Sequence, residues 1–236
     1  MKGLGLASVS SCTYVKDKRE TPLEFRIETA NFDLPKGITA YPALLSEEEI
    51  RRKLEPELAK YPPSMISDHL SQLLVVRGNS LHCDGVRIGG LVDEKYPGQI
   101  ILDEQILANP DTGFHHEFSS VLLRQHQERF PWEEWKSATP DNFRYGADHK
   151  AGSPIAACSV CFSKDPGLNE KGFVCEYGQV DIEEDINTLA HALFARTPEM
   201  MSMKREYGRI GKKIESIILF YDKINGNNFF RDQFKS

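Results

Sequence analysis

The chain reads DTGFHHEFSSVLLRQH over residues 111–126. Four apolar side chains in this stretch recur at helical spacing and share one face: Phe114, Phe118, Val121 and Leu122. This pattern predicts an amphipathic helix whose apolar face packs into the core. Asp111 or Thr112 can cap the first turn, so we expect the helix to span about 111–126.

Short apolar segments precede this helix. Residues 73–76, 86–92 and 99–102 are apolar or β-branched and are separated by Gly-Asn, Asp-Gly and Pro-Gly turn signals, which predicts three strands. Further upstream, Ser46 and Glu49 match a capping box, which predicts a helix from residue 46. A shorter helix is expected over 64–70.

Further helices are expected after the 111–126 helix. The span 131–178 is rich in loop residues, and we expect Trp132 and Trp135 to anchor it on the core. Helical spacing returns over 181–196 and 203–224. Helices, then strands, then helices predict an α+β fold, in which a small antiparallel or mixed sheet packs against the 111–126 helix and the C-terminal part is helical.

Composition narrows the classes of function. The chain has 236 residues, 40% of them hydrophobic, and a formal net charge of −6. An acidic balance argues against sequence-independent binding to nucleic acid, because such binding requires clustered positive charge. The sequence has no apolar run of the roughly 20 residues that a membrane-spanning helix needs, so no transmembrane span is expected.

The N-terminus has two interpretations. Residues 9–12 read VSSC, which fits a bacterial lipoprotein cleavage site with a lipid anchor at Cys12. The apolar stretch before it is shorter than a signal core normally is. Residues 1–20 are therefore either the remnant of a lipoprotein signal or an ordinary flexible segment, and residues 21–236 are expected to form a single domain.

The five cysteines do not form a recognisable framework. Cys158 and Cys161 make a CxxC pair, and Cys175 with His149 could complete a zinc knuckle, but the second half of that motif is missing. An odd count in a chain of this length indicates no disulfide framework either. Small buried cysteines are the favoured interpretation.

His116 and Glu117 resemble the start of an HExxH zinc-hydrolase motif. There, two histidines four residues apart bind one ion and the Glu takes a proton from water. Ser120 stands where the second histidine should be, and a serine hydroxyl is a poor zinc ligand. His115 lies about 100° around the helix from His116, so both reach one ion only if the helix starts irregularly. His126 lies roughly 16 Å further along the axis and is too distant.

A second polar segment follows downstream. Tyr177 precedes the acidic cluster Glu183, Glu184 and Asp185, which begins a predicted helix. In gluzincins a Glu from a separate helix completes zinc coordination, and a nearby Tyr can stabilise an oxyanion. The strand expected around 89–92 precedes the His-Glu helix, as does the strand that pairs with extended peptide in zincins.

These residues together resemble the zinc-binding metallopeptidases of bacterial envelopes, many of them lipoproteins, whose helix reads HHEFSS. The resemblance covers about 60–195 and includes HHEFSS at 115–120, FRYG at 143–146, GFV at 172–174 and the cluster at 183–187. It implies a gluzincin-like α+β fold, a zinc cofactor, a peptide or protein substrate, and a location in the bacterial envelope or outside the cell, although the sequence also allows a cytoplasmic one.

The resemblance also implies roles for single residues. His116 would be the first zinc ligand, with Glu183 or Glu184 as another and His115 as a further candidate. Glu117 would be the general base and Tyr177 would lie near the oxyanion. Three more residues would support the ligands or replace one: Ser120, Asp185 and His191. Where relatives carry a second Glu, this chain has His191, either a substituted ligand or a surface histidine.

Three hypotheses follow. The first is a zinc-dependent peptidase or related amide hydrolase. The second is a zincin-like fold without turnover, which binds peptide or another surface component through an incomplete metal site. The third is an interaction module with an accidental HHE triplet, and it predicts that Glu183 and Glu184 lie far from His116.

Overall fold

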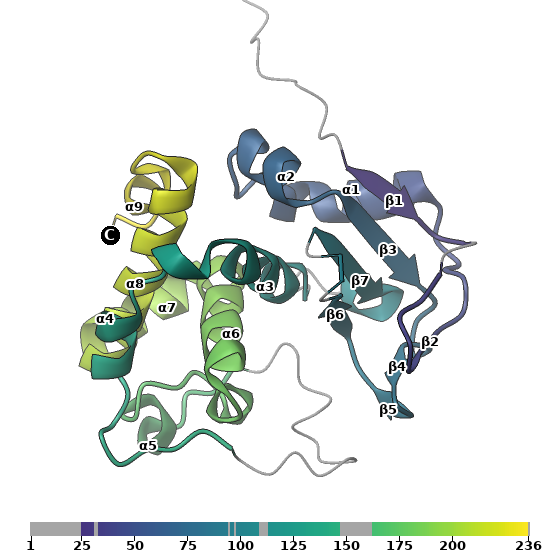
Figure 1. The fold of residues 1–236 in the computed structure, drawn as a ribbon. Coiled ribbons are helices and arrows are strands. Elements are labelled where there is room, and N and C mark those ends of the chain that lie inside the picture. The colour runs from purple at the N-terminus through teal and green to yellow at the C-terminus, as the bar shows by residue number, and fades with distance from the viewer. Residues whose placement is uncertain are drawn as a thin grey trace, which may run out of the picture.

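The computed structural model describes residues 25–30, 33–93, 95, 96, 98–108, 113–146 and 162–235. In Figure 1 a small sheet with its covering helices lies on one side and a bundle of helices on the other, with α3 (Phe114–His126) between them. The α+β class expected from the element order is confirmed. Within the described residues no helix is long and apolar enough to span a bilayer.

The main sheet is mixed. Its strand order is β1 (Arg26–Glu28), β3 (Gln72–Val76), β7 (Gln99–Asp103) and β6 (Gly90–Val92). The first three strands are parallel, and β6 pairs antiparallel with β7, with Gly90 opposite Leu102. β3 and β7 lie in the centre of the sheet, and their apolar side chains are buried on both faces, as is typical of parallel strands. β6 is the edge strand.

A second, smaller sheet joins three two-residue strands, β2 (Ile38–Thr39), β4 (His82–Cys83) and β5 (Val86–Arg87). The single strand predicted over 86–92 is therefore wrong. The chain leaves this sheet at Ile88, whose amide bonds the Leu81 carbonyl, and joins the main sheet at Gly89, whose carbonyl accepts from Asp103.

Two helices precede the central sheet strands, α1 (Glu47–Leu58) and α2 (Pro63–His69). The capping box predicted at Ser46 and Glu49 is confirmed, because the Ser46 side chain accepts from the Glu49 amide and the Glu49 carboxylate accepts from the Ser46 amide. The remaining α-helices are α4 (Trp132–Ser137), α5 (Pro166–Asn169), α6 (Ile182–Ala195), α7 (Thr197–Glu206), α8 (Gly208–Asn225) and α9 (Phe229–Gln233).

The short 3-10 helices are η1 (Glu104–Ala108), η2 (Gln127–Arg129) and η4 (Glu176–Gln179). The span 131–178, expected to be rich in loops, thus also contains α4 and α5, and Trp135 is fully buried there as expected. The single helix predicted over 203–224 is wrong, because Tyr207 adopts an extended conformation and divides α7 from α8.

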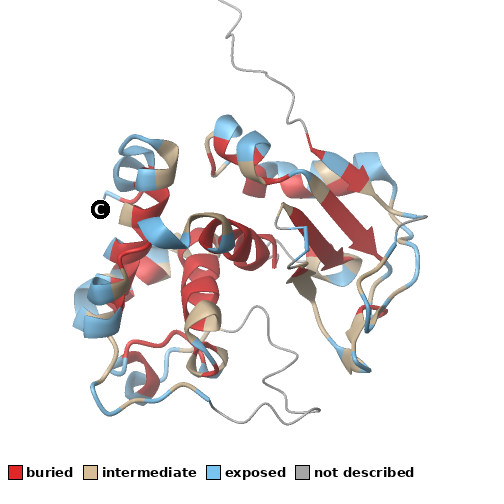
Figure 2. Cartoon of the chain, viewed as in Figure 1, coloured by how far each residue is buried: buried red, intermediate tan, exposed pale blue. Residues whose placement is uncertain are grey.

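One apolar core joins both halves of the molecule. It includes Leu73 and Leu102 of the sheet, Phe118 of α3, Leu189 of α6 and Ile214 of α8. Figure 2 shows that α3 and α6, which pack against each other, are almost entirely buried. Because this burial extends to the polar side chains of both helices, those side chains must find partners inside the protein.

Cys175 is buried and forms a disulfide whose partner lies outside the described residues. The expected burial is confirmed for this residue, and an oxidised Cys175 is not a thiolate ligand for a zinc knuckle. Cys12, His149, Cys158, Cys161 and the segment 1–20 all lie outside the described residues.

Candidate active site

A polar pocket of about 200 Å³ lies between the edge strand β6, helix α3 and the start of α6. Its walls come from 88–92 on the strand side, from α3, and from the segment around η4 and the first turn of α6. The side chains that line it on the helical side are His116, Glu117, Ser120, Arg124, Tyr177, Asp181, Glu183 and Glu184.

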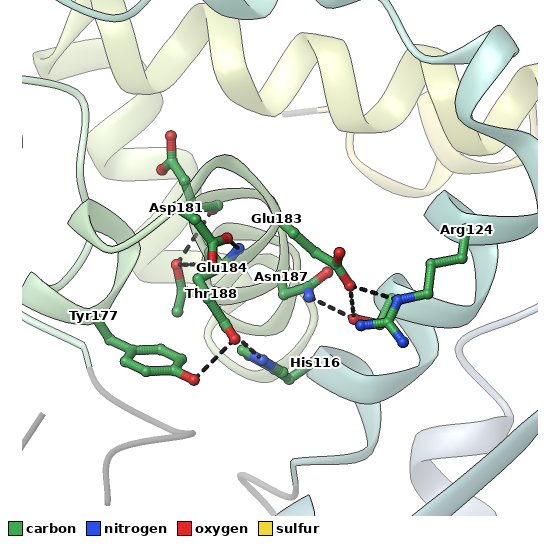
Figure 3. Close-up of polar contacts among 10 residues, drawn as sticks. His116, Arg124, Tyr177, Asp181, Glu183, Glu184, Asn187 and Thr188 are labelled. Atoms are coloured by element: carbon green, nitrogen blue, oxygen red, sulfur yellow. Dashed lines mark hydrogen bonds and ion pairs between the residues drawn. The ribbon is translucent and has the colours of Figure 1, made fainter. Parts of the chain in front are cut away.

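His116 and Glu184 meet at this pocket. The Nε2 atom of His116 lies 3.0 Å from Oε2 of Glu184, and the Tyr177 hydroxyl donates to the other carboxylate oxygen at 2.9 Å. Figure 3 shows the His116 and Tyr177 side chains converging on Glu184 from two sides. The proximity of His116 to the 183–185 cluster that a shared ligand role requires is confirmed, and the hypothesis that placed these acidic residues far from His116 is contradicted.

Burial and neighbouring charges shift the pKa values of His116 and Tyr177. Burial opposes a charge on His116, but the hydrogen bond and negative charge of Glu184, with the charges of Glu117 and Glu183, raise the pKa of His116 above its ordinary value. Burial and the charge of Glu184 also raise the pKa of Tyr177, so its hydroxyl keeps its proton and acts as a donor.

Glu117 lies against the edge strand. Burial, with help from the carboxylates of Glu184 and Glu183, raises the pKa of Glu117 to about 7, although His116 acts in the opposite direction. A carboxyl group with such a pKa can both accept and return a proton near neutral pH. A Cβ atom at Gly90 would come within 2.8 Å of Glu117 Oε1, so the glycine permits this close approach.

Glu183 does not face His116 in the same way. Its Oε1 atom accepts from the Ser120 hydroxyl at 2.7 Å and from Arg124 Nε at 2.9 Å. Ser120 in turn accepts from the Asn187 side-chain amide at 2.7 Å. Ser120, at the position where an HExxH motif would have its second histidine, therefore joins α3 to α6 by hydrogen bonds, and Glu184 is the acidic residue that His116 contacts.

The edge strand presents backbone groups to the pocket. Gly89 accepts from the Asp103 amide, so its carbonyl points toward β7. In an antiparallel pair the direction alternates along the strand, so Gly90 and Val92 direct their backbone groups outward. Val92 agrees with this pattern, because its carbonyl accepts from Arg124 Nη1 at 3.0 Å.

Asp185 points away from the pocket. Its Oδ2 atom accepts from Lys213 Nζ at 2.6 Å and from the Tyr145 hydroxyl at 2.7 Å, and both charged side chains are buried. Lys213 also lies 4.2 Å from the centre of the Phe173 ring. Asp185 therefore fastens the first turn of α6 to α8.

His115 lies outside the pocket lining. Its Nε2 atom is 2.6 Å from Glu57 Oε2 and its Nδ1 atom is 2.9 Å from the Tyr61 hydroxyl. Since α3 is regular from Phe114, His115 and His116 point in different directions, and the expected ligand role does not fit His115. His191 is 2% exposed and faces His115, so it is neither a surface residue nor part of the pocket lining.

The donor set fits two positions of a zinc site. Two ligand atoms that each bind zinc at about 2.0–2.1 Å lie about 3.3 Å apart in a tetrahedral site, close to the 3.0 Å between His116 Nε2 and Glu184 Oε2. Within the described part of the chain, the buried His116 Nδ1 has no hydrogen-bond partner. Across the described residues no three His, Cys, Asp or Glu side chains form a ready-made metal-binding group.

Four further site residues were given no role from the sequence: Gly90, Arg124, Asn187 and Lys213. Arg124 follows Ser120 by four residues and His116 by eight, so helical spacing alone could have placed it on the same face. Asn187 follows Glu183 by four residues in the same way. Nothing in the sequence signals that Lys213 pairs with Asp185, because this contact depends on how α8 packs on α6.

Comparisons with protein-family models, curated proteins and solved structures yield no match.

Proposed function

We propose that this protein is a zinc-dependent hydrolase of peptide or related amide bonds. The observation that carries the proposal is the approach of His116 to Glu184, 3.0 Å apart on two different helices at the floor of a polar pocket. A histidine and a carboxylate directed at one point are typical zinc ligands. The adjacent Glu117 is a carboxyl group that can exchange a proton near neutral pH.

The arrangement of elements supports a zincin-like interpretation of the fold. A helix with a His-Glu pair packs beside an antiparallel edge strand, and a second helix supplies a glutamate. An edge strand with outward backbone groups can add an extended peptide as a further strand. Both features agree with the resemblance to envelope metallopeptidases in the sequence.

Each residue of the site has a separate role in the proposed hydrolysis. His116 and Glu184 would hold the zinc, and the Tyr177 hydroxyl steadies the Glu184 carboxylate. Bound zinc supplies Lewis acidity, which polarises a carbonyl and lowers the pKa of water. Glu117 takes a proton from the attacking water and returns it to the leaving amine. Gly90 gives this carboxylate the room to lie against the strand.

A peptide-binding protein without turnover is the second candidate. It is favoured by one observation: among the described residues, no third His, Cys, Asp or Glu side chain joins His116 and Glu184 in a metal-binding group. A site with two protein ligands holds zinc more weakly than one with three, so the two candidates differ in metal occupancy.

The proposal also includes an envelope location with a lipid-bearing Cys12. Mass spectrometry of protein purified from its native cells would detect the lipid on Cys12, and an unmodified chain that begins at Met1 would contradict this part.

Hydrolysis of peptides tests the function. Purified protein supplied with zinc should cleave members of a peptide library, and a chelator should stop cleavage until zinc is restored. Peptide binding without any cleavage under the same conditions would support the second candidate.

A further inference from the structure

Arg124 closes one end of the edge strand. Its Nε atom bonds Glu183 and its Nη1 atom bonds the Val92 carbonyl, so the side chain spans from α6 to the outer edge of β6. The Val92 carbonyl is one of the groups that an added strand would use. A peptide that pairs with β6 must therefore stop before Val92 or displace Arg124.

The open backbone next to this arginine is short. The outward groups between the Glu117 contact and Arg124 are the amide and carbonyl of Gly90 and the amide of Val92. Gly90 and Val92 are two residues apart, which corresponds to about 7 Å of extended chain. One or two substrate residues fit beside this length.

The direction of a bound peptide follows from strand pairing. Antiparallel pairs are more stable per residue than parallel ones, so we expect a substrate to run antiparallel to β6. Such a peptide passes from the Val92 end toward Gly90 and Glu117. The residues on its amino side then lie against Arg124.

One carboxylate at this end can receive an amino terminus. Glu183 lines the pocket, lies next to Arg124 in Figure 3, and has a side chain that is 33% exposed. The Arg124 guanidinium is already bonded to Glu183 and to Val92. A terminal ammonium group can approach the exposed side of the Glu183 carboxylate, whereas a chain that continues in the amino direction meets the arginine.

We propose that the pocket accepts the free amino end of a peptide and that Arg124 sets this limit. This inference rests on the proposed function, because it assumes that a peptide pairs with β6. The reaction is removal of one or two residues from the amino end. The oxygen of water bonds the carbonyl carbon, the carbon–nitrogen bond breaks, and the leaving nitrogen takes the proton that Glu117 carries.

Binding and product analysis together test the inference. A tetrapeptide library is prepared with free and with acetylated amino ends, and binding is measured calorimetrically on zinc-supplied Glu117→Gln protein so that no turnover intervenes. We expect the free form to bind at least about tenfold more tightly, the usual effect of a hydrogen bond to a charged group. Equal binding of the two forms, or binding of neither, would overturn the inference.

Variants separate the two features of the site. Arg124→Ala in the Glu117→Gln background should let acetylated and longer peptides bind. The same change in otherwise wild-type protein should yield products of cleavage inside the peptide chain. Glu183→Gln should reduce the preference for a free amine. Arg129→Ala, which removes an exposed arginine that bonds Glu128, is the matched control and should retain wild-type selectivity. A preference unchanged in both Arg124→Ala and Glu183→Gln would contradict the assignment.

The two proposals fail in different ways. If the free-amine preference appears in binding but wild-type protein cleaves nothing, the hydrolase proposal fails and the amino-end site stands. If wild-type protein cleaves acetylated and free peptides at equal rates within the chain, the hydrolase proposal stands and the amino-end site fails.

Discussion

The imidazole of His116 on α3 and the carboxylate of Glu184 on α6 face each other across 3.0 Å, in contact with the same pocket as Glu117 and the edge strand. Neither helix carries a complete site. The chemistry therefore depends on how α3 and α6 are held together, by Ser120 and Asn187 at the pocket and by the Asp185–Lys213 pair behind it.

Glu117→Gln separates proton transfer from metal binding. The amide keeps the shape of the side chain but cannot accept a proton, so we expect hydrolysis to fall by about 10²–10⁴-fold while zinc content and fold are retained. Peptide cleavage, metal analysis and circular dichroism measure the three quantities. Glu128→Gln changes an exposed glutamate outside the pocket lining and serves as the control. Near wild-type cleavage by Glu117→Gln would show that Glu117 is not the general base.

Gly90→Ala tests the contact between the edge strand and the base. The new Cβ would lie 2.8 Å from Glu117 Oε1 and 3.0 Å from Cδ2 of the buried Leu102, so the carboxylate must move and the leucine must shift by a few tenths of an ångström. Displacement of a catalytic group by about 1 Å can reduce activity about 100-fold, and we expect this loss in protein that stays folded but melts at a somewhat lower temperature because Leu102 is crowded. At Gly78 the nearest atom to an added Cβ is 3.5 Å away, so Gly78→Ala is the matched control. Equal activity of the two variants would contradict the account.

The buried Asp185–Lys213 pair should govern stability. Removal of one partner leaves an uncompensated buried charge, so Lys213→Met should destabilise the protein by about 3–5 kcal/mol in urea unfolding. Adding Asp185→Asn removes the orphaned charge and keeps an acceptor for Tyr145, so the double variant should regain most of the loss. Lys212→Met, at an exposed neighbouring position, should be close to neutral. A double variant as unstable as the single one would show that the ion pair is not the cause.

Glu57 should contribute a pH-dependent part of the stability. Burial opposes its charge, but hydrogen bonds with His115 and Lys60 lower the pKa of Glu57 below its ordinary 4.5. Because the folded-state pKa is lowered, this stabilisation is present above pH 4.5 and disappears as the pH falls through the folded value. Glu57→Gln should therefore cost about 1–3 kcal/mol at pH 7 and progressively less below pH 4.5.

Urea midpoints between pH 7 and pH 3 measure this effect, with the exposed Glu55→Gln as control. A difference between wild type and Glu57→Gln that stays constant over the whole range would show that the Glu57 charge is not involved.

Elements with a strong local signal were predictable from the sequence. The Ser46–Glu49 capping box, the apolar stripe that includes Phe114 and Phe118, and the buried strand at 73–76 all appear in the structure. Strands of two or three residues, such as β4 and β5, are too short to show any periodicity. Tyr207 belongs to an unbroken helical pattern, and only its extended backbone reveals the division between α7 and α8.

The site was predictable in part for the same reason. His116, Glu117 and the 183–185 cluster follow from motif and helical position. The direction of His115 depends on Glu57 and Tyr61, more than 50 positions away in the chain, and no local pattern encodes that contact. The choice of Glu184 over Glu183 as the partner of His116 likewise depends on Arg124 and Ser120, which bind Glu183 instead.

Zinc binding by His116 and Glu184 can be measured directly. Protein is purified without chelator, loaded with zinc and dialysed against metal-free buffer, and its zinc content is determined by inductively coupled plasma mass spectrometry. We expect about one zinc per wild-type chain, close to none in His116→Ala or Glu184→Ala, and wild-type content in His82→Ala, whose histidine lies outside the pocket lining. Wild-type protein without zinc, or His116→Ala protein that retains it, would contradict a metal site at His116 and Glu184.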